Sequence, residues 1–220
     1  MNSLIDRLST DLKPVRPALP PVRATLLWVF FSALGTLALF ATVLHFRTNW
    51  EAASARITFW LCLGSLLATM TGCAAAAIRS GLPGRSRSAR SELLGPLAFA
   101  FFFGSLAFDL FATPARGSAL GASLLVEGLD PRSGMHCSFT VMFLAIVPAL
   151  LLAWRLRTTA PTEPRKAGLW AGLAAGAAGA FGLAFCCPSE NPVHLLIWHG
   201  LPVLALSLLG GLIGQRLLRW

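Results

Sequence analysis

The side chains of this chain that can bind a soft metal ion or react with an oxidant lie mostly near the same ends of its apolar segments. All four histidines and four of the five cysteines share this placement; they are His45, Cys62, His136, Cys137, Cys186, Cys187, His194 and His199. Cysteine and imidazole are preferred ligands of zinc and softer divalent ions, and thiolates also react with oxidants. The pattern predicts a metal-binding or redox-responsive site on one side of the molecule.

The segments that must position these residues are long and apolar. The chain is 55% hydrophobic and 12% charged, whereas a soluble domain carries about 25% charged residues. About 20 helical residues cross the hydrocarbon layer of a bilayer. The composition therefore predicts an all-α, polytopic membrane protein whose 220 residues divide into a tail, 1–23, and a six-helix transmembrane domain, 24–220. The six expected spans are 24–46, 57–78, 93–112, 136–154, 167–185 and 193–213.

The basic residues lie mostly on the opposite side from the cysteines and histidines. If the loops alternate between two sides, the side of the N-terminus holds Arg7, Lys13, Arg16, Arg23, Arg79, Arg85, Arg87, Arg90, Arg155, Arg157, Arg165, Lys166, Arg216 and Arg219. The other side holds only Arg47, Arg56, Arg116 and Arg132. Cytoplasmic loops are rich in Lys and Arg, so both termini are expected in the cytoplasm. The net charge of +9 thus indicates topology and contact with lipid headgroups, with no direct nucleic-acid partner.

The N-terminal tail carries an amphipathic pattern followed by prolines. Leu4, Ile5, Leu8 and Leu12 form one apolar stripe of a short helix, and Lys13-Pro14 ends it. Two interpretations stay open. The stripe lies on the membrane surface, or it docks into the groove of a cytoplasmic partner.

The fifth and sixth spans must be neighbours because a short loop joins them. We therefore expect four residues of this region to lie close together: Cys186, Cys187, His194 and His199. That Cys137 lies beside them is an inference about how the helices of the bundle pack. Adjacent cysteines are poorly placed to bridge each other, so a bond from either Cys186 or Cys187 to Cys137 is favoured. Cys62, Cys73 and His45 are interpreted as packing or interfacial residues.

Two further patterns concern the bundle itself. The fifth span carries a ladder of small residues, Gly168, Gly172, Gly176, Gly179 and Gly182, which predicts that this helix sits in the middle. Asp109, near the outer end of the third span, is expected to reach the membrane interface or a loop arginine such as Arg116.

The chain resembles the NrsF-type membrane anti-sigma factors of bacteria. The resemblance rests on three features: Leu4 to Leu8 with Leu12-Lys13-Pro14-Val15-Arg16, Cys137 at the fourth span, and the ending from Cys187-Pro188 through Trp198-His199-Gly200 to Trp220. It implies a multi-pass protein of the inner membrane that holds an extracytoplasmic-function sigma factor inactive. It also implies that a periplasm-facing pair, Cys137 and Cys187, senses heavy-metal or oxidative stress. The chain departs from the family at Cys186, where a histidine is expected.

The resulting hypothesis is a signal transducer without catalytic activity. It requires no cofactor, binds a heavy-metal ion at most transiently, and offers Leu4, Ile5, Leu8, Leu12 and Arg16 to the sigma factor. Association between copies of the chain stays open. A thiol–quinone oxidoreductase is one alternative, but it needs a CxxC-like pair, which the sequence lacks. A metal transporter is another, but it needs ligands along a pathway, and only Cys73 lies deep on the inner side.

Overall fold

The structure is a computed structural model that describes residues 9–10, 19–42, 44–82, 89–112, 117–159 and 161–218. Within these residues the chain is helical, without strands, as the sequence predicts. The elements are α2 (Pro21–Thr42), α3 (Trp50–Ser54), α4 (Ile57–Ser80), α5 (Ala89–Ala112), α6 (Gly117–Gly128), α7 (Pro131–Arg157), α8 (Pro164–Leu183), α9 (Pro192–His194), a π-helical turn (Leu195–Gly200) and α10 (Leu201–Leu217).

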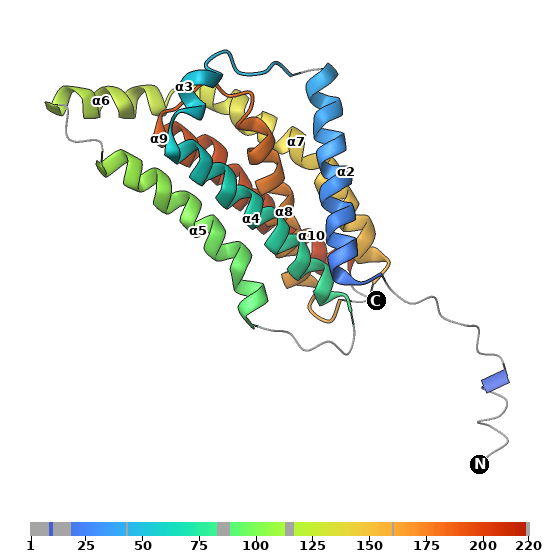
Figure 1. The fold of residues 1–220 in the computed structure, drawn as a ribbon. Helices are drawn as coiled ribbons and strands as arrows, with labels where there is room; N and C mark the ends of the chain where they lie inside the picture. Colours follow the sequence, from blue (N-terminus) through green and yellow to red (C-terminus); the bar gives the residue numbers. More distant parts are fainter. Residues whose placement is uncertain are drawn as a thin grey trace.

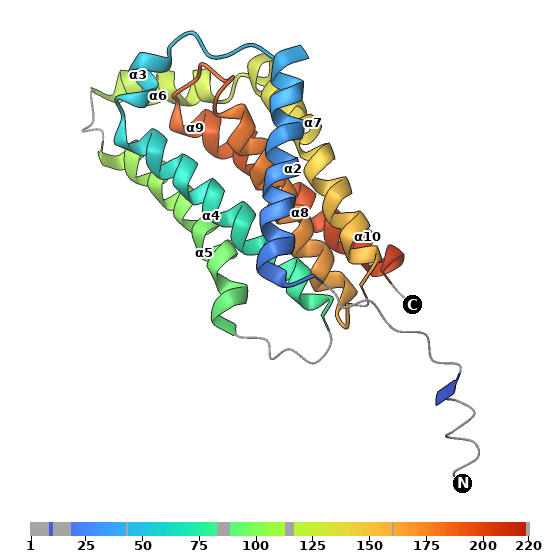
Figure 2. The ribbon, with the colours of Figure 1, turned by 45° about the vertical axis from the view of Figure 1, so that its right-hand side comes forward.

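The long helices lie side by side and run between two ends of the bundle (Figures 1 and 2). The start of α2 and the end of α10 lie at one end, and α3, α6 and α9 lie at the other. The loops that carry the cysteines and histidines thus lie at the end of the bundle opposite the start of α2 and the end of α10. The predicted tail residues Leu4, Ile5, Leu8, Leu12 and Arg16 lie outside the described residues.

Five helices in the described part of the chain are long and apolar enough to cross a bilayer: Pro21–Phe40, Ile57–Ser80, Glu92–Phe111, Pro131–Arg157 and Pro192–Leu217. The sixth predicted span, 167–185, does form a helix, α8, but this helix is not among the five. Glycine and alanine make up most of this helix. The count of six crossings and the cytoplasmic position of both termini therefore stay predictions, as does the division of the chain at residue 23.

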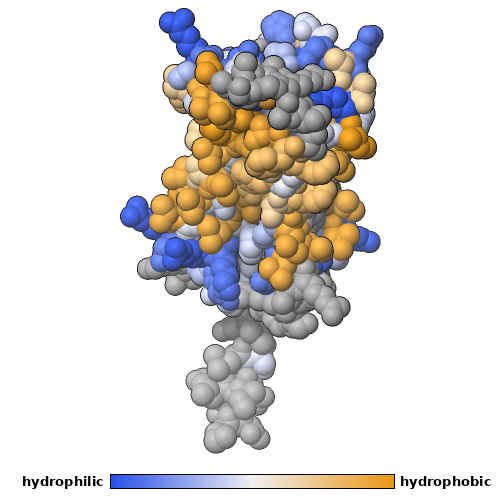
Figure 3. Space-filling view, turned by 90° about the vertical axis from the view of Figure 1, so that its left-hand side faces the viewer, coloured by the Kyte–Doolittle hydropathy of each residue, from blue (hydrophilic) through white to orange (hydrophobic). Residues whose placement is uncertain are grey.

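Large apolar side chains cover the outside of the bundle between its ends. On one face, an apolar band separates two hydrophilic ends (Figure 3). In α5, Phe108 is 72% exposed and Phe111 is 82% exposed, which would be unfavourable in water. In a bilayer the same side chains contact lipid, so the surface fits a membrane protein.

The glycine-rich helix α8 lies at the centre and packs against α4, α7 and α10. All residues from Gly172 to Ala180 are buried. A Cβ atom on Gly168 would overlap the carbonyl oxygen of Gly210, and one on Gly172 would overlap that of Leu206. The absence of side chains therefore lets the backbones of α8 and α10 touch, which confirms the central position expected from the small-residue ladder.

One helix boundary and one connection differ from the sequence prediction at the end that holds the cysteines. Helix α7 begins at Pro131 instead of 136, because Asp130 accepts hydrogen bonds from the backbone N–H groups of Arg132 and Ser133, at 3.4 and 3.0 Å. Cys137 consequently lies in the second helical turn. The connection between the predicted spans 93–112 and 136–154 contains a further helix, α6.

Candidate functional site

Four buried side chains meet at one end of the bundle. Cys137 comes from α7, Cys187 from the loop after α8, His194 from α9 and His199 from the π-helical turn. One ligand atom from each lies within 4.8 Å of the others. We call these four residues the thiol–imidazole cluster. With Cys62 and His45 set aside, the sequence predicts six metal ligands, Cys137, Cys186, Cys187, His136, His194 and His199, and the cluster contains four of them.

The distances within the cluster are those of direct contact. The Sγ atoms of Cys137 and Cys187 are 3.7 Å apart, with the Cys137 thiol donating to the Cys187 sulfur. The Cys187 sulfur lies 3.8 Å from Nε2 of His194. The rings of His194 and His199 meet edge to face, with their centroids 5.7 Å apart. All five cysteines of the chain are free thiols.

The other two predicted ligands lie outside the cluster. His136 is exposed although it adjoins Cys137, because successive residues of a helix point in different directions. Cys186 is half-buried and is not one of the four grouped ligands. Of the two cysteines that could face Cys137, the structure therefore brings Cys187 into contact with it.

The π-helical turn explains how two histidines five residues apart share one face. In an α-helix, residues five apart are separated by about 140° around the axis, so one would point away. In a π-helix the hydrogen bonds run from i to i+5, which stacks such residues one above the other. Single π-turns of this kind often occur at functional sites. The turn at Leu195–Gly200 thus directs both His194 and His199 into the cluster.

Side-chain hydrogen bonds hold this turn in place. Asn191 caps α9 by accepting from the backbone N–H of Val193 at 2.9 Å, and it donates to the Leu124 carbonyl of α6 at 2.8 Å. The Trp198 indole donates to the Gly128 carbonyl at 2.9 Å. Ser138 donates to the Trp198 carbonyl at 3.0 Å, which links the turn to α7 one residue after Cys137. The outer helix α6 therefore supports the histidine-bearing segment.

The two loop cysteines differ in their electrostatic surroundings. The hydrogen bond from Cys137 lowers the pKa of the Cys187 thiol, and the imidazoles of His194 and His199 act in the same direction against desolvation by burial. Burial, together with the negative charge of a Cys187 thiolate, raises the pKa of Cys186 to about 11. Cys187 is accordingly the loop cysteine whose thiolate, the reactive and metal-binding form, is stabilised.

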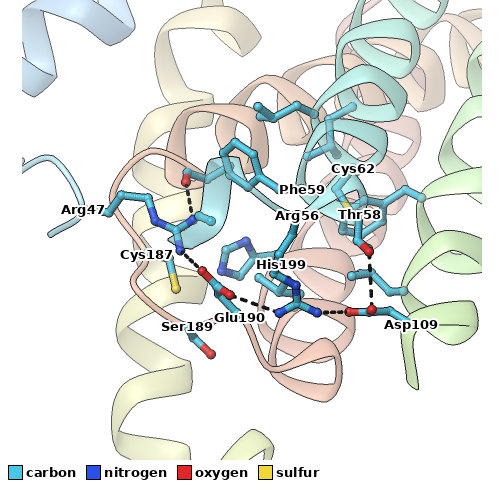
Figure 4. A pocket seen from close by; sticks show the side chains of 17 residues that line it. Arg47, Arg56, Thr58, Phe59, Cys62, Asp109, Cys187, Ser189, Glu190 and His199 are labelled. Carbon is cyan, nitrogen blue, oxygen red and sulfur yellow. Dashed lines mark hydrogen bonds and ion pairs between the residues drawn. The ribbon is translucent and has the colours of Figure 1, made fainter. Parts of the chain in front are cut away.

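A chain of ion pairs that was not predicted from the sequence borders the cluster. Glu190 pairs with Arg47 at 3.2 Å and with Arg56 at 3.1 Å, and Arg56 also pairs with Asp109 at 2.6 Å. Figure 4 shows the Glu190 carboxylate between the two guanidinium groups, with Cys187 and His199 close by. The observed partner of Asp109 is thus Arg56, whereas the sequence analysis names Arg116, which lies outside the described residues.

These ion pairs join four parts of the chain. Arg47 follows α2, Arg56 precedes α4, Asp109 lies near the end of α5, and Glu190 lies three residues after Cys187. Arg47 is 6% exposed, and its backbone N–H also donates to the Phe185 carbonyl at 2.9 Å. A signal was present in the sequence, because Arg47 and Arg56 are two of the few basic residues on the side that also carries the cysteines.

A pocket opens beside the cluster and contains the ion pairs. Its empty volume is about 570 Å³, and its lining includes Cys187, His199, Glu190, Asp109 and Cys62. Nε2 of His199 is buried and has no hydrogen-bond partner in the described part of the chain. The pocket therefore adjoins the cluster at Cys187 and His199, and Arg47 and Arg56 line it as well.

The remaining cysteines and His45 are not among the four grouped ligands. Cys73 is fully buried, and a Cβ atom on Gly95 would overlap its sulfur, so it fills a close contact between α4 and α5. The sulfur of Cys62 lies 3.5 Å from the Ser105 hydroxyl. His45 is exposed.

Comparisons with known proteins agree over almost the whole chain. A family model described as NrsF, negative regulator of sigma F, matches residues 8–220. The anti-sigma-F factor NrsF of Caulobacter vibrioides (strain NA1000 / CB15N) is 31% identical over 223 residues, which cover 100% of this chain and 99% of that protein. A probable anti-sigma-F factor NrsF of Azospira oryzae (strain ATCC BAA-33 / DSM 13638 / PS) is 27% identical over 190 residues, 86% of this chain and 85% of that protein.

No solved structure matches the chain. The family match nevertheless runs through the helical bundle, the thiol–imidazole cluster and the C-terminal helix, and a full-length relative exceeds 30% identity. The resemblance indicated by the tail, by Cys137 and by the C-terminal motifs is thereby confirmed: this chain belongs to the NrsF family, the negative regulators of sigma F.

Proposed function

We propose that the chain is a membrane-embedded anti-sigma factor of the bacterial inner membrane. It holds an extracytoplasmic-function sigma factor at its cytoplasmic face and releases it when the thiol–imidazole cluster meets a soft metal ion or an oxidant. The observation that supports this most directly is that the cluster and most basic residues lie at different ends of the bundle. The cluster lies at the end opposite the start of α2 and the end of α10, where the basic residues are concentrated.

The topology in this proposal has six crossings with both termini in the cytoplasm. Helix α8 has 20 residues, which is sufficient for a span, and it is shielded from lipid by α4, α7 and α10. A shielded helix does not need strongly apolar side chains. Its alanines and glycines are therefore compatible with a crossing, and the loops before and after it then lie on opposite sides.

A route for the signal follows from which elements the cluster connects. Cys137 belongs to α7, Cys187 follows α8, and the two histidines precede α10. Any change in the separation of these four residues moves the ends of three packed helices relative to one another. Backbone contacts between α8 and α10, such as that of Gly172 with Leu206, carry the shift along the bundle. Two alternative packings of these helices then correspond to the retaining and releasing states.

At the cytoplasmic face, the proposed contacts with the sigma factor are the apolar stripe Leu4, Ile5, Leu8 and Leu12, together with Arg16. The test is co-purification of a sigma factor with the intact protein and with a version that lacks residues 2–13. Capture by the intact protein and loss with the shortened one is the expected result. Failure of the intact protein to retain any sigma factor would overturn the anti-sigma assignment.

The sensing step is tested separately with a double substitution, Cys137→Ser with Cys187→Ser. This variant should still retain the sigma factor but should no longer release it on exposure to metal or oxidant. The matched control is Cys73→Ala, which changes a buried cysteine outside the cluster and should leave release intact. Normal release by the double variant would contradict sensing by these two residues.

A further inference from the structure

We propose that Cys137, Cys187, His194 and His199 form a tetrahedral, four-ligand site for a single soft divalent cation of the zinc and cadmium class. The two imidazoles act as full ligands alongside the thiolates. This inference rests on the proposed function, because it names the ligand of the same sensing site. It has its own test, which needs no sigma factor.

The spacing of the ligand atoms carries the argument. Zinc binds thiolate sulfur at about 2.3 Å and imidazole nitrogen at about 2.0–2.1 Å. The corners of a tetrahedron are about 1.63 times farther apart than their distance from the centre, which gives about 3.8 Å between two sulfurs and about 3.6 Å between sulfur and nitrogen. The structure has 3.7 Å between the sulfurs of Cys137 and Cys187, and 3.8 Å between Cys187 and His194. These two distances match the tetrahedral values, and all four ligand atoms lie within 4.8 Å of one another.

The state of the fourth residue points to the same conclusion. Nε2 of His199 is buried and without a hydrogen-bond partner in the described residues, and the residue is 2% exposed. A buried polar atom without a partner is costly and calls for an explanation. Coordination of a cation would satisfy this nitrogen or fix the ring through its other nitrogen. The π-helical turn, which departs from regular α-helix, brings this ring to the cluster.

Charge and ligand chemistry define the class of ion. On binding, each thiol loses its proton, so one divalent cation and two thiols give a neutral centre and release two protons to solvent. A neutral centre suits a buried site, where an unbalanced charge is unfavourable. Two sulfur and two nitrogen donors in a tetrahedron select zinc-like ions over magnesium or calcium, which require oxygen ligands.

The pocket supplies a path for the ion. Cys187 and His199 line it together with the carboxylates of Glu190 and Asp109. Arg47 and Arg56 also line the pocket and pair with these carboxylates, so an entering cation passes charge-balanced ion pairs before it reaches the sulfur and nitrogen ligands. Cys186 and His136 lie outside this arrangement, so they are not ligands in the proposed site.

The direct test is a titration of the purified, reduced full-length protein in detergent with Co²⁺, followed by displacement with Zn²⁺ or Cd²⁺. Tetrahedral Co²⁺ with thiolate ligands gives intense visible bands and a sulfur-to-metal charge-transfer band. We expect these bands with one ion bound per chain. Weak bands typical of six-coordinate Co²⁺, or no binding, would overturn the proposal.

Two substitutions assign the imidazoles. His194→Ala and His199→Ala should each weaken Co²⁺ binding by more than about 100-fold, since even outer partners of metal ligands contribute 10- to 100-fold. His136→Ala is the matched control, because it removes an exposed histidine beside Cys137 and should bind as the unmodified protein does. Unchanged affinity and spectra of both cluster variants would show that the histidines are not ligands.

A third variant covers the case in which the alanine variants fail to fold. His199→Cys keeps a ligand at this position, so it should bind Co²⁺ with a stronger charge-transfer band that reports a third thiolate. An unaltered spectrum in a folded His199→Cys protein would contradict coordination by residue 199. The proposed function fails on a different result, namely a protein that binds the ion as described but never releases a sigma factor.

Discussion

The carboxylate of Glu190 lies 3.2 Å from the guanidinium of Arg47, and this ion pair fastens the loop that carries Cys187 to the segment after α2. The Arg47 side chain is 3% exposed and that of Glu190 is 26% exposed, so water screens the pair only partly. The same carboxylate also binds Arg56 at 3.1 Å. The Glu190 side chain therefore links the loop that carries Cys187 to two other parts of the bundle.

Replacing this carboxylate should loosen the loop. In Glu190→Ala, Arg47 stays buried without a carboxylate to balance its charge, and we expect a loss of about 2 kcal/mol of stability together with faster maleimide labelling of Cys187. Thermal unfolding in detergent, followed by tryptophan fluorescence, and labelling rates provide the measurements. Glu51→Ala is the control, because Glu51 is exposed on α3. Equal effects of the two substitutions would show that the ion pair does not stabilise the loop.

The contact between α8 and α10 depends on the absence of a side chain at Gly172. A methyl group there would overlap the Leu206 carbonyl, so Gly172→Ala should separate the helices and destabilise the bundle by about 1–3 kcal/mol. The apparent unfolding temperature measures this change.

The control for that substitution is Gly64→Ala in α4, where a Cβ atom would meet nothing within 4 Å. Alanine favours helix over glycine by up to about 1 kcal/mol, so this variant should be unchanged or more stable. A Gly172→Ala protein as stable as Gly64→Ala would mean that α8 and α10 do not touch through their backbones.

The start of α7, six residues before Cys137 in the chain, depends on the hydrogen bonds that Asp130 accepts. The hydrogen bond from the backbone N–H of Ser133 lowers the pKa of the Asp130 carboxyl the most, and the hydrogen bond from the Ser133 hydroxyl lowers it further. Because the pKa is lower in the folded state, the cap stabilises α7 fully at pH values above the ordinary pKa of 3.8. This stabilisation is lost as the pH falls through the lower pKa of the folded state.

Amide hydrogen exchange in the first turn of α7 tests this cap. In Asp130→Ala, exchange at Arg132 and Ser133 should be faster at neutral pH, while Asp130→Asn, which retains an accepting oxygen, should change it much less. Exchange that is equally slow in all three proteins would rule out a role for the cap.

The sixth crossing is open to a labelling experiment on the loops that flank α8. In a cysteine-free background, Thr162→Cys should react with a membrane-impermeant maleimide only from the cytoplasmic side, and Ser189→Cys only from the periplasmic side. Whole cells and inverted vesicles give the two readouts. Labelling of both positions from the same side would exclude α8 as a span and leave five crossings.

Metal binding and oxidation should compete for the same two sulfurs. The thiol-oxidant diamide takes up two electrons and two protons as Cys137 and Cys187 join in a disulfide of about 2.05 Å, whereas a tetrahedral ion keeps the sulfurs about 3.8 Å apart. Saturating Zn²⁺ should therefore slow crosslinking at least about tenfold, as measured by thiol labelling and mass spectrometry. Oxidation at an unchanged rate would mean that the ion binds elsewhere.

Much of the architecture could be read from the order of the residues. Apolar stretches of span length determine helices in a bilayer, since every backbone polar group must be satisfied within the segment. The glycine ladder of α8 likewise indicated a central helix. The starts of the helices were harder to locate, because Asp130 and Pro131 begin α7 inside a stretch that lacks the apolar run of the rest of the helix.

The candidate site shows most clearly which features follow from the sequence and which depend on the tertiary structure. By itself, the sequence determined that the cysteines and histidines gather at one end, because that follows from where apolar segments begin and end. Tertiary structure decided which of them meet: His136 turns outward, Cys187 and not Cys186 contacts Cys137, and a π-helical turn brings His199 beside His194. Such choices depend on helix rotation, a departure from α-helical hydrogen bonding and ion pairs between distant segments, none of which has a local sequence pattern.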